Sequence, residues 1–502
     1  MTDSTRPVRT RFAPSPTGSL HIGGLRMALW GWLFARHHGG QFVLRIEDTD
    51  QKRYDPNALQ TLLEALRWVG VDWDEGPEVG GPYGPYVQSE RLSLYQEWAK
   101  WLVDNDHAYY CYCSSERLEQ VNKEKQAAGI PPGYDRRCRY ASPAELASLK
   151  AEAEAEGRNP VIRLKMPREG KSIFPDLVRG DVEFENESIQ DAVLLKGDGF
   201  PTYHLAVVVD DHFMHISHVM RGIEWLPSAP LHMQVWKAFG WEMPQYAHLP
   251  VMLNPNGKGK ISKRKPPVDA KGNVLPVMVH DYIKGGYLAP ALANLLVGIG
   301  WNFGDEVEVF SMDEARERFS DFSRINPSNS AFPMEKLEWI NGLYIREKMT
   351  PDELADALRG PLEAAGLDVD MDTLRKVAPL VQTRIKTLND VVDMAGFFFK
   401  PEFAPPPVEK LIQKKMDAAS TKRALEACIP VIETVDPFTA DKLLETFTEL
   451  GQELGLNNSQ MFGVLRVAAS GQAISTPTFE TMEIVGRAES LRRVKLAIDL
   501  VS

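Results

Sequence analysis

Residues 8–24 read VRTRFAPSPTGSLHIGG, and this stretch sets a strand, a loop and the start of a helix in direct succession. Val8–Ala13 has the pattern of a strand. The prolines and Gly18 that follow require a loop, because proline lacks a backbone donor and fixes its φ angle. Apolar side chains then recur at helical spacing from Leu25 to Leu33, and Gly39-Gly40 ends that helix. The stretch therefore predicts a strand–helix unit.

The turn Ser19–Gly24, with the sequence SLHIGG, lies between that strand and that helix. Such a turn suits a phosphate group, because backbone N–H groups point outward, the helix dipole is positive there and missing side chains permit close approach. His21 adds a donor that can stabilise negative charge on a transferring phosphoryl group. On these residues alone, an ordinary strand–helix turn that contains histidine and glycine is an equal alternative.

The pattern continues with a strand over Phe42–Ile46 and an amphipathic helix over Leu59–Val69. Strand, helix, strand, helix predicts a parallel α/β sheet. Residues 89–187 then read as a long polar and helical region, and strand signals resume at Ala192–Leu195 and Leu205–Val209. This order indicates one α/β domain that is interrupted by an insertion.

Helix patterns dominate from about Met349 to the end of the chain. The segment PEFAPPP at residues 401–407 is the clearest joint, because stacked prolines cannot continue a helix. We therefore expect two small helical parts in the C-terminal third.

A second motif with chemical content is GKGKISKRK at residues 257–265, which holds five cations and no acid. Its glycines suit a mobile loop that closes over a triphosphate and neutralises charge as pyrophosphate leaves. The alternative, a solvated basic surface loop or a nucleic-acid patch, would normally be favoured for such a run.

The chain has 502 residues and a formal net charge of −12, which argues against coating nucleic acid by bulk charge. The longest apolar stretch, near Ala289–Trp301, contains Pro290 and Asn294 and is too short for a membrane span. The polar N-terminus has no apolar signal core, and four cysteines suit a reducing compartment rather than a disulfide scaffold. We therefore expect a cytoplasmic protein with no membrane partner.

Taken together, the two motifs resemble the class I aminoacyl-tRNA synthetases, with His21–Gly24 as the HIGH signature and Lys260–Arg264 as the KMSKS signature. Bacterial glutamyl-tRNA synthetases are the most similar family, because they share the PSPTG lead-in and the glycine that ends the first signature. The resemblance covers essentially the whole chain in order, through RIEDTD (45–50), FPTYHLA (200–206), VDDH (209–212), RGIEWL (221–226), LEWIN (337–341) and LRVA (465–468).

The resemblance implies activation of L-glutamate by ATP with Mg²⁺ and transfer to the terminal adenosine of tRNA(Glu), with bound tRNA required for activation. The anticodon reader cannot be assigned from one sequence, so tRNA(Gln) stays open as a second acceptor, and we expect a monomer. Two alternatives are a nucleotidylyltransferase of the same fold with another substrate and a catalytically silent tRNA-binding paralogue. The first would leave the helical third without a purpose, and the second is disfavoured because His21 and Lys263 are present.

The family's site residues carry over position by position. The implied catalytic residues are His21, Lys260 and Lys263. The implied ATP-binding residues are Pro14, Gly18, His21, Ile22, Gly23, Gly24 and Glu224, with the loop Lys260, Ile261, Ser262, Lys263 and Arg264. The implied glutamate-binding residues are Arg11, Ala13, Ser15, Glu47, Tyr203 and Arg221. Guanidinium groups suit the two carboxylates of glutamate, and a carboxylate suits its ammonium group.

The implied fold is α/β, with a Rossmann-type parallel-sheet catalytic domain, an inserted acceptor-binding domain, a connector and an all-α C-terminal anticodon-binding region. The expected boundaries are 1–86 and 201–256 for the split catalytic domain, 87–200 for the insertion, 257–340 for the connector with its KMSKS-type loop, and 341–400 and 401–502 for the helical subdomains. Candidate RNA contacts in the helical third are Arg375, Lys376, Arg384, Lys386, Arg492, Arg493 and Lys495.

Three of the four cysteines, Cys111, Cys113 and Cys138, have a spacing that suits Zn²⁺. Part of the family binds zinc in the insertion with a similar set, completed by a histidine two residues after the last cysteine or a tyrosine four before it. Here Tyr140 replaces the histidine and Tyr134 occupies the other position. A structural zinc site and ordinary free thiols stay open as alternatives.

His212, His215 and His218 lie at three-residue spacing on what reads as a strand followed by a turn. Side chains there would not share one face, so we expect structural histidines rather than metal ligands.

Overall fold

The computed structural model describes residues 6–50, 55–262, 264–268, 272, 274–304 and 306–502. The chain divides into two compact units, Met1–Asp281 with Ala293–Pro333 and Tyr282–Leu292 with Met334–Ser502. The two motifs with predicted phosphate chemistry, residues 19–24 and 257–265, both belong to the first unit.

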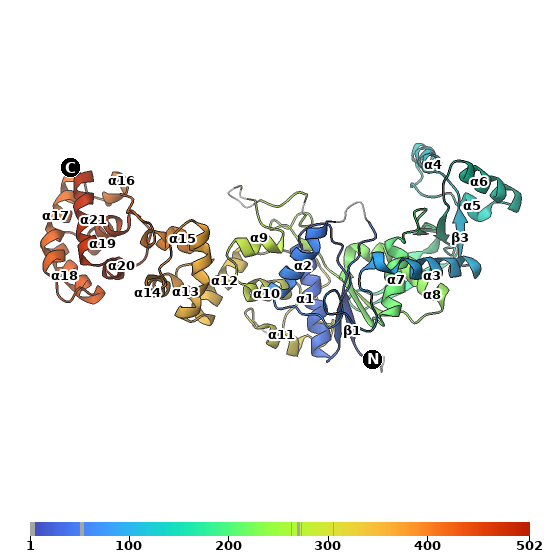
Figure 1. Ribbon diagram of the computed structural model, residues 1–502, viewed down its shortest axis with the longest axis horizontal. Helices are drawn as coiled ribbons and strands as arrows, with labels where there is room; N and C mark the ends of the chain where they lie inside the picture. Colours follow the sequence, from blue (N-terminus) through green and yellow to red (C-terminus); the bar gives the residue numbers. More distant parts are fainter. Residues whose placement is uncertain (1–5, 51–54, 263, 269–271, 273, 305) are drawn as a thin grey trace. The chain divides into compact units, whose positions relative to one another are not determined.

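Parallel strands form the centre of the first unit (Figure 1). Strand β1 (Arg9–Phe12) pairs with β2 (Gln41–Leu44), and β8 (His218–Gly222) pairs with β9 (Gln245–Leu249). The two pairs meet where the Ser217 N–H donates to the Arg9 carbonyl at 2.9 Å, so β1 lies beside β8. The chain leaves β1 toward β2 and leaves β8 toward β9, on opposite sides. The crevice beyond the carboxyl ends of β1 and β8 is therefore the place where such a sheet binds ligands.

Helix α1 (Ile22–His37) follows β1 after the proline-rich loop, as the sequence predicts. Its apolar stripe, which includes Leu25, Leu29 and Leu33, is fully buried. The N-cap is His21, whose Nδ1 accepts the Gly23 N–H at 3.0 Å. Helix α2 (Pro56–Trp68) follows β2. This part of the predicted strand–helix–strand–helix order is confirmed.

The predicted insertion, residues 87–200, contains more strands than the sequence suggests. An antiparallel sheet has the order β3 (Ala108–Cys111), β4 (Val161–Leu164) and β7 (Val193–Leu195), and a hairpin joins β5 (Lys171–Asp176) to β6 (Gly180–Glu185). The expectation of a helical region over 89–187 is therefore only partly right. Strand β5 alternates exposed and buried residues, and β6 has no fully buried residue, so neither strand forms an apolar run in the sequence. The helices here are α3 (Leu92–Asp104), α4 (Ser115–Ala127), α5 (Arg137–Tyr140) and α6 (Pro143–Ala155).

The strand expected at Leu205–Val209 is wrong, because these residues lie in helix α7 (Tyr203–Phe213). All five are almost fully buried in a core that α3 and α8 (Ala229–Phe239) share. Five consecutive residues cover a full helical turn, so the run is apolar because protein surrounds this helix on all sides. His212 consequently lies in the last turn of α7, where its ring stacks on Trp241 with centroids 3.7 Å apart.

The second unit contains helices and no strand among its described residues. One core gathers around α13–α15 and another around α17–α21, on either side of the proline-rich joint at residues 401–407. Its helices are α12 (Met334–Lys348), α13 (Pro351–Ala364), α14 (Met371–Gln382), α15 (Asp390–Ala395), α16 (Val408–Leu411), α17 (Ala418–Thr434), α18 (Ala440–Glu453), α19 (Asn458–Ser470), α20 (Thr478–Val485) and α21 (Arg487–Leu500). The predicted fold class, a parallel α/β part followed by an all-α C-terminal region, is confirmed.

The remaining elements are short connectors. They are β10 (Met252–Leu253), β11 (Ser330–Ala331), α9 (Val279–Lys284), α10 (Ala289–Gly298), α11 (Met312–Arg318) and the 3₁₀ turns at Gln88–Arg91, Asn186–Ser188, Ile223–Ser228 and Gly396–Phe398. Among the described residues, no helix has the length and apolar content that crossing a membrane would require.

Candidate functional site

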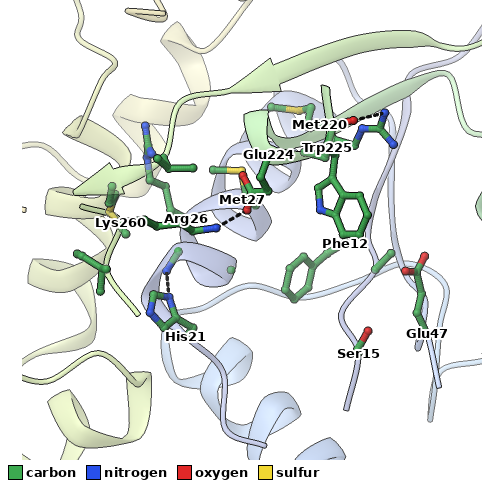
Figure 2. Close-up of a pocket in the computed structure, with 18 of the residues that line it drawn as sticks. Phe12, Ser15, His21, Arg26, Met27, Glu47, Met220, Glu224, Trp225 and Lys260 are labelled. Atoms are coloured by element: carbon green, nitrogen blue, oxygen red, sulfur yellow. Dashed lines mark hydrogen bonds and ion pairs between the residues drawn. The ribbon is translucent and has the colours of Figure 1, made fainter. Parts of the chain in front are cut away.

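A cavity of about 1100 Å³ opens at the carboxyl ends of β1 and β8, where the sheet topology predicts a ligand (Figure 2). It gathers most of the side chains that the sequence assigned to ATP and glutamate. The predicted residues that line it are Arg11, Ala13, Ser15, His21, Gly23, Gly24, Glu47, Tyr203, Arg221, Glu224, Lys260, Ile261, Ser262 and Arg264.

Four predicted residues stand apart from this lining. Pro14 and Gly18 belong to the loop but do not line the cavity, and Ile22 is fully buried beneath it. Gly18 has a φ of 123°, which a side chain would strain, so its role is to let the loop turn. Lys263 lies outside the described residues.

The N-terminus of α1 forms one end of the cavity. Because the Gly23 N–H donates to Nδ1 of His21, the proton of a neutral His21 ring resides on Nε2. Gly23 and Gly24 line the cavity beside it, and α1 has no acidic residue in its first turn to neutralise the helix dipole. This end can hold a phosphate and donate a hydrogen bond to it.

Lys260 reaches the same cavity from the basic loop. Its Nζ forms an ion pair with Glu224 at 2.5 Å, and both side chains are about half exposed. Figure 2 shows this pair on the same side of the cavity as His21, whereas Glu47 and Ser15 lie on the other side. The cavity thus has a cationic, phosphate-compatible end and a second end with different chemistry.

That second end contains a buried charge network. Arg11 donates to Asp211 at 3.2 Å, and Arg45 donates to Asp211 at 2.7 Å and to Glu47 at 3.0 Å. Burial alone would raise the pKa of Asp211, but Arg11 and Arg45 outweigh burial and lower it. Asp211 is therefore an anion at neutral pH that holds both guanidinium groups in place.

Glu47 behaves in the opposite way. Burial raises the pKa of Glu47 above its ordinary value, and the attraction of Arg45 and Arg11 offsets only part of this effect. A cation arriving in the cavity would favour the ionised form of this carboxylate. Glu47 is accordingly suited to bind the ammonium group of an amino acid.

Arg221, at the end of β8, is almost fully buried. It donates from Nε to His248 at 2.9 Å, and from Nη1 to His232 at 3.0 Å and to the Tyr203 hydroxyl at 3.3 Å. No carboxylate lies within ion-pair distance of Arg221 in the described part of the chain. Its charge is therefore available to an anionic ligand.

Sequence reasoning missed several lining residues. Trp225 lies within a quoted motif but was given no role, and its ring packs against Tyr203 with centroids 4.3 Å apart. Arg26 is fully buried and donates to the carbonyls of Pro250 and Ile299 at 2.8 and 2.6 Å. Its position on α1 gave no sequence signal, because most arginines in folded proteins are exposed.

The predicted zinc ligands come together in the insertion. The sulfur atoms of Cys111, Cys113 and Cys138 lie within 4.8 Å of one another. The Tyr134 hydroxyl lies 3.3 Å from the Cys111 sulfur and 3.8 Å from the Cys113 sulfur. Tyr140 is exposed and outside this cluster. Three thiols and one phenol supply four donors, which is the number that structural Zn²⁺ prefers, with sulfur as its preferred ligand.

Several candidate RNA contacts of the helical third have partners within the second unit. Arg384 donates to the Ser475 carbonyl at 2.9 Å, Lys386 pairs with Glu338 at 2.8 Å, and Arg492 and Arg493 both pair with Glu489. Similar but longer pairs join Arg375 to Asp372 at 3.6 Å and Lys495 to Glu433 at 3.8 Å. An RNA role for these cations stays a prediction.

Comparison with known proteins agrees with this geometry. Residues 7–339 match the family described as tRNA synthetases class I (E and Q), catalytic domain, and residues 347–498 match the family described as anticodon binding domain. Glutamate–tRNA ligases of Roseiflexus sp. (strain RS-1) and Dehalococcoides mccartyi (strain ATCC BAA-2266) are 45% and 44% identical to this chain, covering 98% and 99% of it and 96% and 99% of the relatives.

Solved structures give the same result. The crystal structure of a glutamate tRNA ligase from Elizabethkingia meningosepticum, in complex with its amino acid, matches with a TM-score of 0.86 and 34% identity over 99% of this chain and 100% of that one. The structure of glutamate-tRNA synthetase from Elizabethkingia anophelis matches with a TM-score of 0.84. The chain therefore belongs to the glutamate–tRNA ligase family of class I aminoacyl-tRNA synthetases.

Proposed function

We propose that the protein activates L-glutamate with ATP in the cavity at β1 and β8 and transfers it to the terminal adenosine of tRNA(Glu). The observation that carries this proposal is that residues suited to bind phosphate and residues suited to bind an amino acid line the same cavity. His21 and Lys260 stand at one end and Glu47 stands at the other. Arg11 and Arg221 also line the cavity, and Arg11 shares Asp211 with Arg45, the partner of Glu47. The cavity thus has room and charge for a triphosphate beside a dianionic amino acid.

Binding of glutamate follows from the second end. Arg11 and Arg221 take its carboxylates through charge-assisted hydrogen bonds, and Glu47 takes its ammonium group. Burial raises the pKa of Tyr203, so its hydroxyl keeps its proton and can donate. Ala13 and Ser15, after β1, complete this end.

Adenylation requires no protein nucleophile. The α-carboxylate of glutamate attacks the α-phosphate of ATP, an acyl–phosphate bond forms, and pyrophosphate leaves. His21 and the α1 N-terminus stabilise charge that develops on the phosphoryl oxygens, and Lys260, with Lys263 by family resemblance, neutralises the departing pyrophosphate. Transfer then replaces the adenylate by the ribose hydroxyl of the tRNA.

Mg²⁺ suits the phosphate end, because Glu224 offers one carboxylate there and Mg²⁺ in such sites takes its other ligands from phosphates and water. When bound, it would screen the negative charge of the phosphates.

The cysteine cluster supports a further part of the proposal. We propose that Cys111, Tyr134, Cys113 and Cys138 hold a structural Zn²⁺ in the insertion. The support is the convergence of four donors on one point. The zinc would fix β3 to α5 and would supply no step of the reaction.

We also propose roles for the other parts of the chain, which rest on the family resemblance. The insertion at 87–200 takes the acceptor end of tRNA, the segment 257–340 is the connector, and 341–400 and 401–502 read the anticodon. The protein works as a monomer in the cytoplasm, and tRNA(Gln) stays open as a second acceptor.

ATP–pyrophosphate exchange tests the proposed function. Exchange of labelled pyrophosphate into ATP should require both glutamate and tRNA. A folded, tRNA-saturated protein that shows no glutamate-dependent exchange would contradict the proposal. A catalytically silent tRNA-binding paralogue would give that second result, and a nucleotidylyltransferase for another substrate would show exchange only when that substrate replaces glutamate.

A further inference from the structure

We propose that Asp176, His248 and His232 are positioning residues that hold the Arg221 guanidinium in its ligand-binding orientation while leaving its charge unneutralised. This inference rests on the proposed function, in which Arg221 binds a carboxylate of glutamate. None of the three lines the cavity, so each acts through Arg221.

One side of Arg221 is held by a two-membered relay. Oδ2 of Asp176 lies 2.6 Å from Nδ1 of His248 and also accepts the backbone N–H of His248 at 3.0 Å. An ionised carboxylate can only accept, so the His248 proton resides on Nδ1. Nε2 of His248 is then left with its lone pair, which accepts the Arg221 Nε–H at 2.9 Å.

The other side of Arg221 is held by a second ring. Nδ1 of His232 accepts from Nη1 of Arg221 at 3.0 Å, and Nε2 of His232 lies 3.0 Å from Nδ1 of His204. Because Arg221 is donor-only, His232 must present a lone pair at Nδ1, and its proton resides on Nε2, directed at His204. Two neutral rings thus clamp the guanidinium from two directions.

The choice of neutral acceptors has an electrostatic consequence. Arg11 is held by the buried carboxylate of Asp211, which balances much of its charge. Arg221 is held in place by uncharged rings, and burial lowers the pKa of both His232 and His248, which keeps them uncharged at neutral pH. A bound carboxylate therefore meets a fixed and largely uncompensated cation.

Asp176 is placed for this task by the insertion. It ends strand β5, and its Oδ1 accepts the N–H groups of Val178 and Arg179 at 2.9 Å each. Each carboxylate oxygen of Asp176 thus accepts from two donors. An NH₂ group in place of either oxygen would face those donors and could not accept from them. The loop that closes the β5–β6 hairpin therefore fixes the orientation of the carboxylate that sets the His248 tautomer.

The isosteric variant Asp176→Asn tests the relay. The NH₂ group of the new asparagine must face either the backbone N–H groups of Val178 and Arg179 or His248. In the second case Nδ1 of His248 loses its proton, and Nε2–H then points at Arg221 Nε–H. We expect KM for glutamate to rise roughly 10- to 100-fold, the range for loss of a hydrogen bond to a charged group. KM for ATP should stay within about twofold, because the phosphate end does not share these contacts.

The matched control is Asp181→Asn, the same change at an exposed position on the partner strand β6, which should leave both KM values unchanged. A second pair of variants covers the case in which Asp176→Asn fails to fold. His248→Gln can still offer Arg221 a hydrogen-bond acceptor, so it should keep part of the wild-type affinity for glutamate. His248→Leu has no acceptor and should lose that affinity.

Three results would overturn the inference. They are an unchanged glutamate KM in Asp176→Asn, an equal rise of both KM values, and equal activity of His248→Gln and His248→Leu. A wild-type protein that does not charge glutamate would instead refute the proposed function, so the two failures are distinguishable.

Discussion

Lys260 and Glu224 form an ion pair at 2.5 Å at the phosphate end of the cavity, so the lysine of the basic loop is held by an acid. Both side chains are about half exposed, and such pairs contribute only about 0–1 kcal/mol. ATP phosphates can therefore take Lys260 from Glu224 at little cost.

The variant Lys260→Ala should lower kcat for adenylation roughly 100-fold, because one charge-stabilising group is lost in the transition state. Its melting temperature should match the wild type, since the broken pair is solvent-screened. The matched control is Lys237→Ala, an exposed lysine near the end of α8. A variant with wild-type exchange kinetics would show that Lys260 does not act on the phosphates.

The two roles of His21 can be separated by mutation. His21→Asn can still accept the Gly23 N–H and cap α1, but it loses the Nε2 donor. We expect kcat to fall roughly 100-fold with little change in stability. His21→Ala should lose activity similarly and in addition lose about 1 kcal/mol of stability, because the cap is gone. Chemical denaturation and exchange kinetics measured on both variants check this; full activity in His21→Asn would refute the donor role.

Zinc content tests the cysteine cluster. Purified wild-type protein should contain about one zinc per chain, and Cys138→Ser should contain almost none and melt at a lower temperature. Cys428→Ser is the control, because this buried thiol lies in the core of the second unit and donates to the Ala424 carbonyl. A metal-free wild type, prepared without chelators, would refute the site.

Stability of the first unit should fall as the pH drops from about 6.5 to about 4. Burial lowers the pKa of His204 and of His218 to about 4. Between the unfolded and folded pKa values the unfolded chain binds protons that the folded chain does not, so acid favours unfolding in this window. Every tryptophan except Trp339 lies in the first unit, so tryptophan fluorescence reports its denaturation. His218→Gln should flatten the pH dependence, and an unchanged slope would contradict this assignment.

Most of the predicted site residues line one cavity, and the sequence could point to them because they lie in short, ordered motifs. The loop after β1, the N-terminus of α1 and the end of β8 each carry their functional residues within a few positions, and parallel strands bring such ends together. Tyr134 and the three cysteines were also found, since they lie within 28 residues of one another (111–138).

Two kinds of feature were not predictable. Leu205–Val209 was assigned to a strand because a short apolar run looks the same in a buried helix, and α7 is packed on several sides. The contact of Asp176 with His248 joins residues 72 positions apart across two parts of the chain. No sequence motif contains both residues, so their contact is visible only in the tertiary structure.

We propose that this cavity selects glutamate for attachment to tRNA. The most direct measurement is aminoacylation with purified tRNA(Glu) and tRNA(Gln), each offered labelled glutamate and labelled glutamine in parallel. We expect glutamyl-tRNA(Glu) and no attachment of glutamine to either tRNA, because Arg11, Glu47 and Arg221 suit a dianion with one ammonium group. Attachment of glutamine, or no attachment of glutamate by folded protein at saturating ATP and tRNA, would contradict it.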